Sequence, residues 1–242
     1  MKTILLSAAA LLAAFHVQAS LIANDDAGQA AYSGGFLNGT DGGTGFQPWT
    51  LSFTGGGGSY IGGTGLGAGS FGIYASGGAG TGAVAGRSFD AALNVGDEFS
   101  IELGHTTIQG GGEVGISLFS GANYRFNMKS QGGDWMLNDG GGDFTTGLTY
   151  SPKTPVTFRF TRGAAANGYS VVIIQGANTY NGLNYTGTSG TMDISRVDLY
   201  SNAQGGGENF GFNNLQVNAV PEPASGALLG LGLMIFAALR RR

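Results

Sequence analysis

Residues 98–103 read Glu-Phe-Ser-Ile-Glu-Leu, one of the clearest alternations of polar and apolar side chains in the sequence. Its three apolar residues fall on one face of an extended chain and its three polar residues on the other. This period of two is typical of a β-strand with one face in a core and one face in water. The stretch therefore predicts a half-buried strand.

Short segments of the same kind occur on both sides of this strand. A tetrapeptide at 120–123 joins two of them into a predicted hairpin, and one slip of the alternation near Ser195 predicts a bulge. Glycines cluster between the segments, and we expect Gly55–Gly58 to be a break. The expected strands lie around Ala31 and Tyr32 and at 49–53, 71–74, 84–91, 98–103, 114–119, 124–128, 135–137, 155–161, 169–174, 192–200 and 209–217.

Composition supports an all-β chain. Glycine supplies 48 of 242 residues and charged residues only 11%, while aromatic residues reach 11%, which argues against a disordered coil. About ten to twelve strands separated by glycine turns predict an antiparallel β-sandwich. The absence of cysteine excludes thiol catalysis and thiolate metal sites. No basic patch interleaved with aromatic residues is present, so we expect no nucleic-acid partner.

The first nineteen residues read as a secretory signal peptide. Lys2 precedes an apolar run from Ile4 to Phe15, and Val17 and Ala19 are the small residues that signal peptidase needs at −3 and −1. We therefore expect handling by the Sec translocon and signal peptidase, with cleavage after Ala19. Residues 20–218 would then form the exported domain, with 7 basic and 14 acidic residues between 20 and 219.

The last residues, 219–242, combine three parts in order. Val220, Pro221, Glu222 and Pro223 form a stiff, extended peptide. An apolar run from Ala224 to Leu239 follows, which as a helix would be about 24 Å long at ~1.5 Å per residue. That predicts a short transmembrane helix, since a bilayer core is ~30 Å thick.

The chain then closes with Arg240, Arg241 and Arg242, which we expect to stop this helix at the cytoplasmic side.

This order resembles the PEP-CTERM sorting signal. The resemblance implies cleavage near the Pro-Glu-Pro motif by an exosortase, a membrane-embedded cysteine transpeptidase. It also implies a Gram-negative bacterium that makes exopolysaccharide, as in a biofilm, with the chain in the inner membrane during transit and then at the cell surface or in the extracellular matrix. An alternative is an ordinary tail-anchored envelope protein that is never cut.

The Gly-Phe-Gln-Pro-Trp stretch at 45–49 and the Phe-Gly-Phe-Asn-Asn-Leu-Gln-Val stretch at 210–217 resemble the concanavalin A-like jelly rolls. The resemblance implies that the first and last strands pair side by side. It also implies possible glycoside hydrolase chemistry, because this fold includes β-glucanases.

Candidate catalytic groups are few. Glycosidases need two carboxyl groups roughly 5–9.5 Å apart, whereas Glu98 and Glu102 are four residues apart on one strand, about 13 Å at ~3.3 Å per residue. The Glu-x-Asp-x-x-Glu pattern of the glucanases is missing. His105 follows the same strand, and without a Gly-x-Ser-x-Gly elbow we interpret it as a surface residue. We expect no enzyme, with a glycan-active hydrolase that uses Glu98 or Glu102 as the alternative.

Two binding hypotheses remain. Asn138, Asp139 and Asp143 in a glycine loop could bind Ca²⁺, which prefers oxygen ligands, although these residues also form ordinary turns. Asn24, Asp25 and Asp26 are a second such group, and no other cofactor is expected.

Tyr124, Trp135 and Tyr180 lie beside loops and are the aromatic residues that we expect to be exposed for stacking on sugars. The sequence therefore predicts an exported, non-catalytic, lectin-like protein that binds glycan, with exopolysaccharide as its partner.

Overall fold

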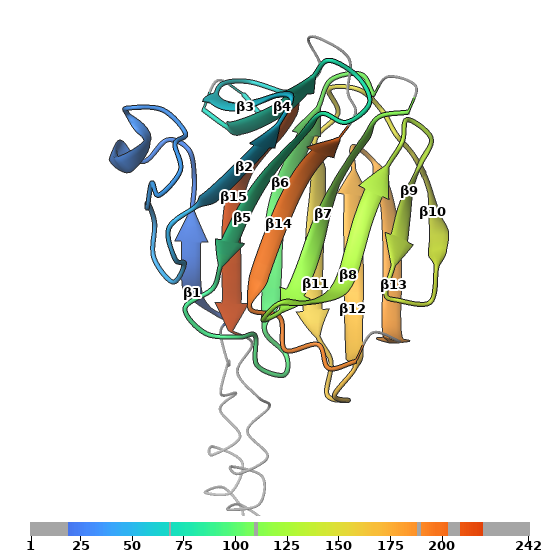
Figure 1. Ribbon diagram of the computed structural model, residues 1–242. Helices are drawn as coiled ribbons and strands as arrows, with labels where there is room; N and C mark the ends of the chain where they lie inside the picture. The colour runs from blue at the N-terminus through green and yellow to red at the C-terminus, as the bar shows by residue number, and fades with distance from the viewer. Residues whose placement is uncertain (1–18, 68, 109–110, 188–189, 203–208, 220–242) are drawn as a thin grey trace, which may run out of the picture. The chain divides into compact units, whose positions relative to one another are not determined.

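In the computed structural model, two antiparallel β-sheets lie face to face (Figure 1). The structure describes residues 19–67, 69–108, 111–187, 190–202 and 209–219. Their strands are β1 (Ser20–Asp25), β2 (Thr50–Thr54), β3 (Gly56–Ile61), β4 (Phe71–Ser76), β5 (Gly82–Ser88), β6 (Glu98–His105), β7 (Glu113–Ser120), β8 (Asn123–Ser130), β9 (Asp134–Asn138), β10 (Asp143–Thr149), β11 (Val156–Arg162), β12 (Gly168–Gln175), β13 (Asn178–Thr186), β14 (Arg196–Asn202) and β15 (Phe210–Ala219).

Each sheet combines runs of consecutive strands with neighbours that are distant in the sequence. One sheet runs β13-β12-β11-β6-β15-β4-β3, with β1 also paired to β15, and the other runs β10-β9-β8-β7-β14-β5-β2. The last strand thus lies in the middle of the first sheet, beside the first strand. This confirms the pairing of chain ends that the jelly-roll resemblance implied, and the all-β sandwich is confirmed with it.

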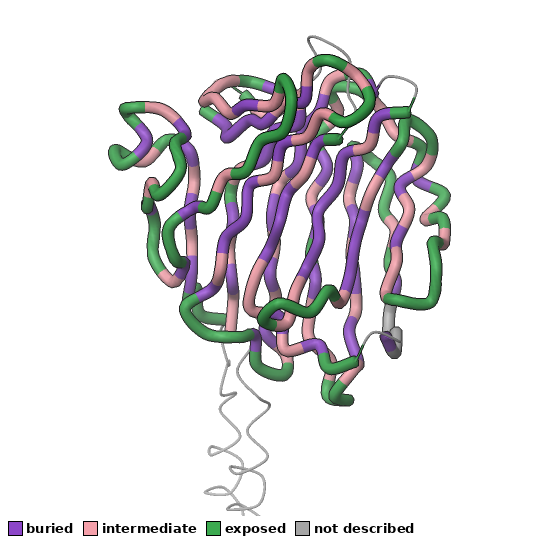
Figure 2. The backbone as a smooth tube through the Cα atoms, viewed as in Figure 1, coloured by how far each residue is buried: buried purple, intermediate pink, exposed green. Residues whose placement is uncertain are grey.

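The core lies between the sheets and follows the alternation in the sequence. Phe99, Ile101 and Leu103 of β6 are buried, while the polar residues between them are partly exposed, as predicted. In Figure 2 the buried residues follow the strands of both sheets and the exposed ones gather in the connections. The predicted hairpin is also confirmed, because β7 pairs with β8 across a turn at Gly121 and Ala122.

The glycine segment at 55–58 was wrongly predicted to be a break. Only Gly55 turns, and Gly56 begins β3. Gly58 lies opposite Tyr74 of β4, and an added Cβ at Gly58 would meet the Tyr74 ring. Tyrosines of both strands thus cover glycines of the neighbouring strand, since Tyr60 lies over Gly72 in the same way. The glycines make room for rings that the partner strand supplies.

Two further expectations were wrong. Ala30–Tyr32 form one turn of 3-10 helix instead of a strand, and Tyr32 from this turn bonds to Asp25. No bulge interrupts β14, which starts at Arg196, after Ser195, and keeps its register along β5 and β7. The slip in the sequence pattern therefore marks the end of a loop.

A buried ion pair holds β1 to the other sheet. The Arg87 guanidinium of β5 bonds to the Asp25 carboxylate, and both side chains are completely buried. The Tyr32 hydroxyl donates to the same carboxylate at 2.6 Å, and the Trp49 indole N–H donates at 3.2 Å. Burial raises the pKa of Asp25, although these bonds oppose the shift. Asp25 is therefore a structural residue, engaged by side chains in the place where we had considered calcium.

Candidate functional site

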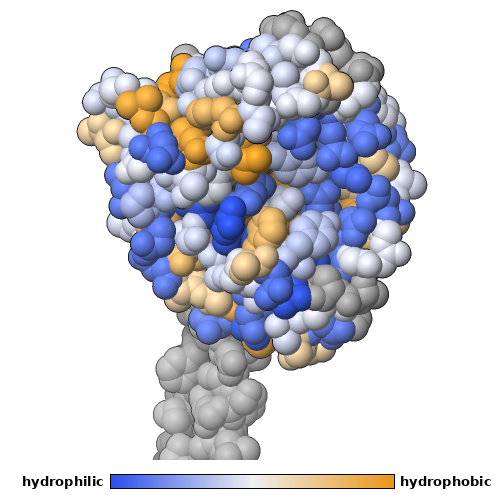
Figure 3. Space-filling view, viewed as in Figure 1, coloured by the Kyte–Doolittle hydropathy of each residue, from blue (hydrophilic) through white to orange (hydrophobic). Residues whose placement is uncertain are grey.

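An open groove crosses the outer face of the seven-stranded sheet. It has a volume of about 340 Å³ and draws its lining from β5, β7, β8 and β14. Figure 3 shows this face, which is mostly hydrophilic over β8–β10 at the right and more hydrophobic at the upper left over β2. The residues that line the groove are Val84, Glu113, Ser117, Phe119, Tyr124, Asn127, Lys129, Asp198, Tyr200 and Asn202.

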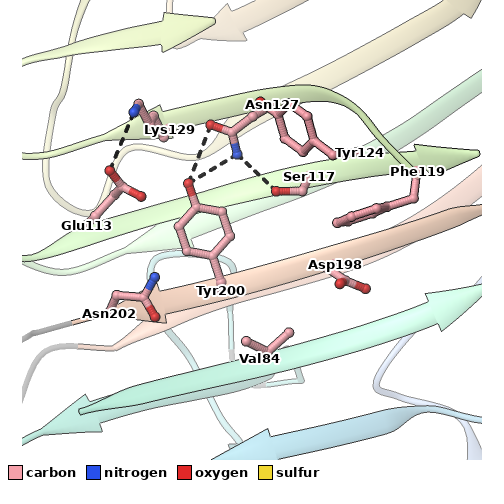
Figure 4. A pocket seen from close by; sticks show the side chains of 10 residues that line it. All are labelled: Val84, Glu113, Ser117, Phe119, Tyr124, Asn127, Lys129, Asp198, Tyr200 and Asn202. Atoms are coloured by element: carbon pink, nitrogen blue, oxygen red, sulfur yellow. Dashed lines mark hydrogen bonds and ion pairs between the residues drawn. The ribbon is translucent and has the colours of Figure 1, made fainter. Parts of the chain in front are cut away.

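Tyr200 lies flat across the middle of the groove (Figure 4). Glycine at position 115 allows this, because an added Cβ there would come 2.5 Å from the Tyr200 hydroxyl oxygen. The amide Nδ2 of Asn127 donates to that hydroxyl at 3.1 Å and to Ser117 Oγ at 3.1 Å. Burial raises the pKa of Tyr200, and the Glu113 carboxylate adds to the shift. The phenol is therefore a fixed, neutral group at the floor of the groove.

Asp198 is fixed at one side of the groove by a neighbour on its own strand. Arg196 donates to the two Asp198 carboxylate oxygens at 2.7 and 2.6 Å. Glycine at position 86 leaves space for this carboxylate, since an added Cβ would lie 2.7 Å from Asp198 Oδ1. The Arg196 guanidinium also lies 5.2 Å from the centre of the Phe119 ring. The ion pair and the ring thus form one continuous wall.

The charged end of the groove is built around Lys129. Its ammonium group lies 2.8 Å from the Asp143 carboxylate of β10 and 3.7 Å from that of Glu113. The bond with Asp143 is the main cause that raises the pKa of Lys129 and lowers that of Asp143. Gln131 donates to Glu113 at 3.0 Å. Both carboxylates are therefore held in place.

Aromatic side chains form the opposite end, where Tyr124 meets Phe119. Their ring centres are 6.1 Å apart in an edge-to-face arrangement. Tyr124 is 38% exposed, as expected, and its hydroxyl donates to the Asn138 carbonyl at 3.4 Å. Burial of the phenol raises its pKa to about 12, with Asp143, Asp139 and Glu113 contributing. The groove therefore has an exposed ring at one end and charges at the other.

The expected exposure of Trp135 is wrong, and Tyr180 is only partly exposed. Trp135 is fully buried, because its position in β9 faces the other sheet, and its indole N–H donates to Gln175 Oε1 at 2.9 Å. Tyr180 of β13 packs against the core of the sandwich. Neither residue lines the groove. Of the three predicted aromatic residues, the structure brings only Tyr124 to this site.

The predicted calcium ligands lie together in the turn between β9 and β10, where each already has a partner. Asn138 donates from Nδ2 to Asp143 Oδ1 at 2.8 Å and accepts from the Gly140 N–H at 2.8 Å. Asp139 accepts from the Tyr169 hydroxyl at 2.9 Å. The Lys129 ammonium supplies the positive charge beside Asp143. Among the described residues no cluster of three metal-binding side chains occurs, and calcium binding stays a prediction.

Glu98 and Glu102, the alternative catalytic residues, lie on the outer face of the other sheet. A separate polar hollow of about 360 Å³ includes Glu102 and Arg159 but not Glu98. Glu102 accepts a bond from Asn214 Nδ2 at 2.8 Å. The two glutamates are thus not brought together in one hollow.

His105 was wrongly interpreted as a surface residue. It is 1% exposed at the end of β6, and its ring stacks on Tyr150 at 4.1 Å between centres. The period of two continues through β6, but the sequence alone did not reveal that Tyr150 and Trp135 cover this position.

The two antiparallel sheets are those of a jelly-roll β-sandwich, and the similar solved structures include lectin-like ones. A solved structure described as a sialidase matches with a TM-score of 0.58 and 10% identity over 84% of this chain, which spans only 19% of the sialidase.

A second match, described by the words "Prominent members of the human gut microbiota express endo-acting O-glycanases to initiate mucin breakdown", has a TM-score of 0.53, 10% identity and coverage of 82% of this chain and 98% of the other. The legume lectin-like domain from Entamoeba histolytica is similar at a TM-score of 0.45, 11% identity and coverage of 70% and 88%.

Residues 219–242 match the PEP-CTERM protein-sorting motif. The predicted sorting signal is therefore confirmed, and such a motif implies processing by an exosortase and an exported protein that is anchored transiently in the membrane before it reaches the cell surface. No curated protein sequence matches the chain.

Residues 1–18 of the predicted signal peptide lie outside the residues that the structure describes. The same holds for Val220, Pro221, Glu222, Pro223, the predicted apolar helix and Arg240, Arg241 and Arg242. Within the described residues, no helix has the length and hydrophobicity to span a bilayer.

Proposed function

We propose that this chain is an exosortase-sorted protein of the cell surface or matrix whose β-sandwich binds glycan in the groove of the seven-stranded sheet without cleaving it. The sorting motif supports the destination. The observation that carries the binding function is the juxtaposition of the exposed Tyr124 ring and the partly exposed Phe119 ring with fixed hydrogen-bonding groups in one open groove.

The chemistry of a sugar matches this arrangement. A pyranose ring has an apolar face, which packs well on an aromatic side chain, and a rim of hydroxyl groups that need donors and acceptors. Tyr124 and Phe119 supply rings at one end. Asn127, Ser117 and Asn202 supply amide and hydroxyl groups further along. Because Asn127 is fixed by bonds to its neighbours, little side-chain entropy is lost when a ligand binds.

The positions of the carboxylates favour binding over hydrolysis. Glu113 and Asp198 line the groove from adjacent strands, but Asp198 pairs with Ser117, four residues along β7 from Glu113. Their positions are therefore about 13 Å apart along the strand direction at ~3.3 Å per residue, beyond the roughly 5–9.5 Å of glycosidases. Each carboxylate also has a cationic partner.

A glycan-active hydrolase remains the alternative function. It would use Glu98 or Glu102 on the opposite sheet, and it predicts that the full-length protein releases reducing ends from β-glucans or from the exopolysaccharide of its host. Loss of that release in Glu102→Gln would support the enzyme. Absence of any release would support the binding function.

The proposed function is tested by retention of the full-length protein on a glycan array. Tyr124→Ala should weaken binding about tenfold or more, equivalent to ~1.4 kcal/mol, because the exposed ring is lost. Phe53→Ala is the matched control, since Phe53 of β2 is an aromatic residue 41% exposed and outside the groove lining. Equal binding by both variants, or no binding to any glycan, would contradict the proposal.

A further inference from the structure

The cations of the groove are neutralised by the protein itself. Lys129, the only cation in its lining as the structure describes it, contacts two carboxylates, at 2.8 Å to Asp143 and 3.7 Å to Glu113. Arg196, next to the groove, donates two hydrogen bonds to the Asp198 carboxylate, at 2.6 and 2.7 Å. A positive group that is already paired offers an incoming anion little, because binding would first have to break the existing pair.

The remaining charges nearby do not reverse this balance. The other cation of β8 is Arg125, which packs against Gly190 and does not line the groove. Asp134 and Asp139 add negative charge along β9 and its turn. Three carboxylates thus face two cations at the groove, with further carboxylates beyond them.

The phenols of the groove respond to the same field. Carboxylates contribute to the raised pKa of both Tyr124 and Tyr200, although burial is the larger cause in each. The two phenols lie toward opposite sides of Asn127 in Figure 4, so the negative potential extends along the groove.

We infer that the groove selects glycans that carry no acidic groups, and that it favours amine-bearing sugars over uronic acids and sulfated sugars. This selectivity rests on the proposed glycan binding and specifies its substrate class. A neutral sugar needs only the ring stacking and the amide and hydroxyl bonds described above. A protonated amine gains attraction from the excess of carboxylates over cations at the groove, whereas a uronate meets like charge.

Three probes of equal length test the inference on the full-length protein: an N-acetylated glucosamine oligosaccharide, its de-N-acetylated form and an oligogalacturonide. Calorimetry at low salt should give the uronide a Kd at least about tenfold weaker than the N-acetylated probe, a difference of ~1.4 kcal/mol. The de-N-acetylated probe should bind at least as tightly as the N-acetylated one, and added salt should reduce its advantage. A uronide that binds as tightly as the neutral probe would overturn the inference.

A charge variant tests the cause. The double variant Glu113→Gln with Asp143→Asn removes both anionic partners of Lys129. The affinity of this variant for the oligogalacturonide should therefore be about tenfold or more higher than that of the wild type. Glu98→Gln with Asp90→Asn is the matched control, since it removes the same charge away from the groove. If both double variants bind the uronide alike, the inference is wrong even though glycan binding stands. Failure of all three probes to bind would instead contradict the proposed function and with it this selectivity.

Discussion

His105 illustrates at the scale of one residue how burial changes a side chain's chemistry. Its Nδ1 lies 3.4 Å from the Thr106 carbonyl oxygen, and its Nε2 is buried without a hydrogen-bond partner among the described residues. Burial lowers the pKa of this imidazole to about 4 from its ordinary value of 6.5. The folded protein therefore holds the ring neutral at pH values where the unfolded chain would protonate it.

This pKa shift predicts acid sensitivity. Since the folded pKa is depressed, the contribution of His105 to stability is complete above pH 6.5 and is lost as the pH falls from 6.5 to 4. The loss should be about 3 kcal/mol at ~1.36 kcal/mol per pH unit. Urea denaturation of the wild type and His105→Gln between pH 7 and pH 4 measures it.

The comparison between the wild type and His105→Gln isolates the effect of the imidazole on the free energy of unfolding, because protonation of the carboxylates in acid affects both proteins equally. The difference between their free energies of unfolding should therefore shift by about 3 kcal/mol in favour of the variant on acidification. A difference that is constant over this pH range would show that His105 does not titrate as its burial implies.

At the scale of an element, β15 contains an irregularity that one residue makes possible. Its register along β6 shifts between Asn213 and Gln216, and Asn214 between them has a positive φ of 52°. Asparagine tolerates this left-handed region better than most residues, whereas a β-branched residue does not. β15 thus pairs with β4 over Phe210–Phe212 and continues along β6 as far as Asn218, with the irregularity at Asn214 between.

Substitution of Asn214 should separate backbone strain from side-chain bonding. Asn214→Val should lower the free energy of unfolding by about 1–3 kcal/mol, because valine is strained at positive φ. Asn214→Gly loses the same bond to Glu102 but adopts this φ freely, so it should stay within about 1 kcal/mol of the wild type. Urea midpoints measure both. Equal destabilisation by the two variants would assign the effect to the lost bond.

Elements of this fold differ in how far the sequence predicts them. The strand at 98–103 was predictable because the alternation of its polar and apolar residues indicates which face is buried. The strand at Gly56–Ile61 was not predictable, because its glycines make close contacts that only the folded sheet reveals. Gly58 lies under the Tyr74 ring of the neighbouring strand, and Gly56 and Gly57 lie against the backbone oxygens of Ser76 and Gly82.

The groove was predictable only in part. Tyr124 was found from its place beside a loop, whereas Tyr200 and Asn127 are 73 residues apart and meet only through the strand order of the folded sheet. Asp25 was likewise hidden, since its partner Arg87 is 62 residues away.

At the scale of the whole molecule, the sorting motif predicts a dependence on its short peptide. The triple substitution Pro221→Ala, Glu222→Ala and Pro223→Ala should abolish trimming, because the rigid, extended segment that an exosortase would bind is lost. Mass spectrometry of the C-terminus and fractionation of the cells measure the result. We expect the variant to keep Arg242 and to stay in the membrane fraction. Delivery of a normally trimmed product to the cell surface would contradict the proposed role of the motif.

The neighbouring first and last strands have a mechanical consequence. In Figure 1, β1 and β15 run in opposite directions, so Ser20 and Ala219 lie at the same end of the pair. A tension applied between these two ends would peel their hydrogen bonds apart one at a time and would not load them in parallel. The domain would therefore yield at low force when pulled from both ends, and it can resist drag at a surface only if it is tethered through one of them.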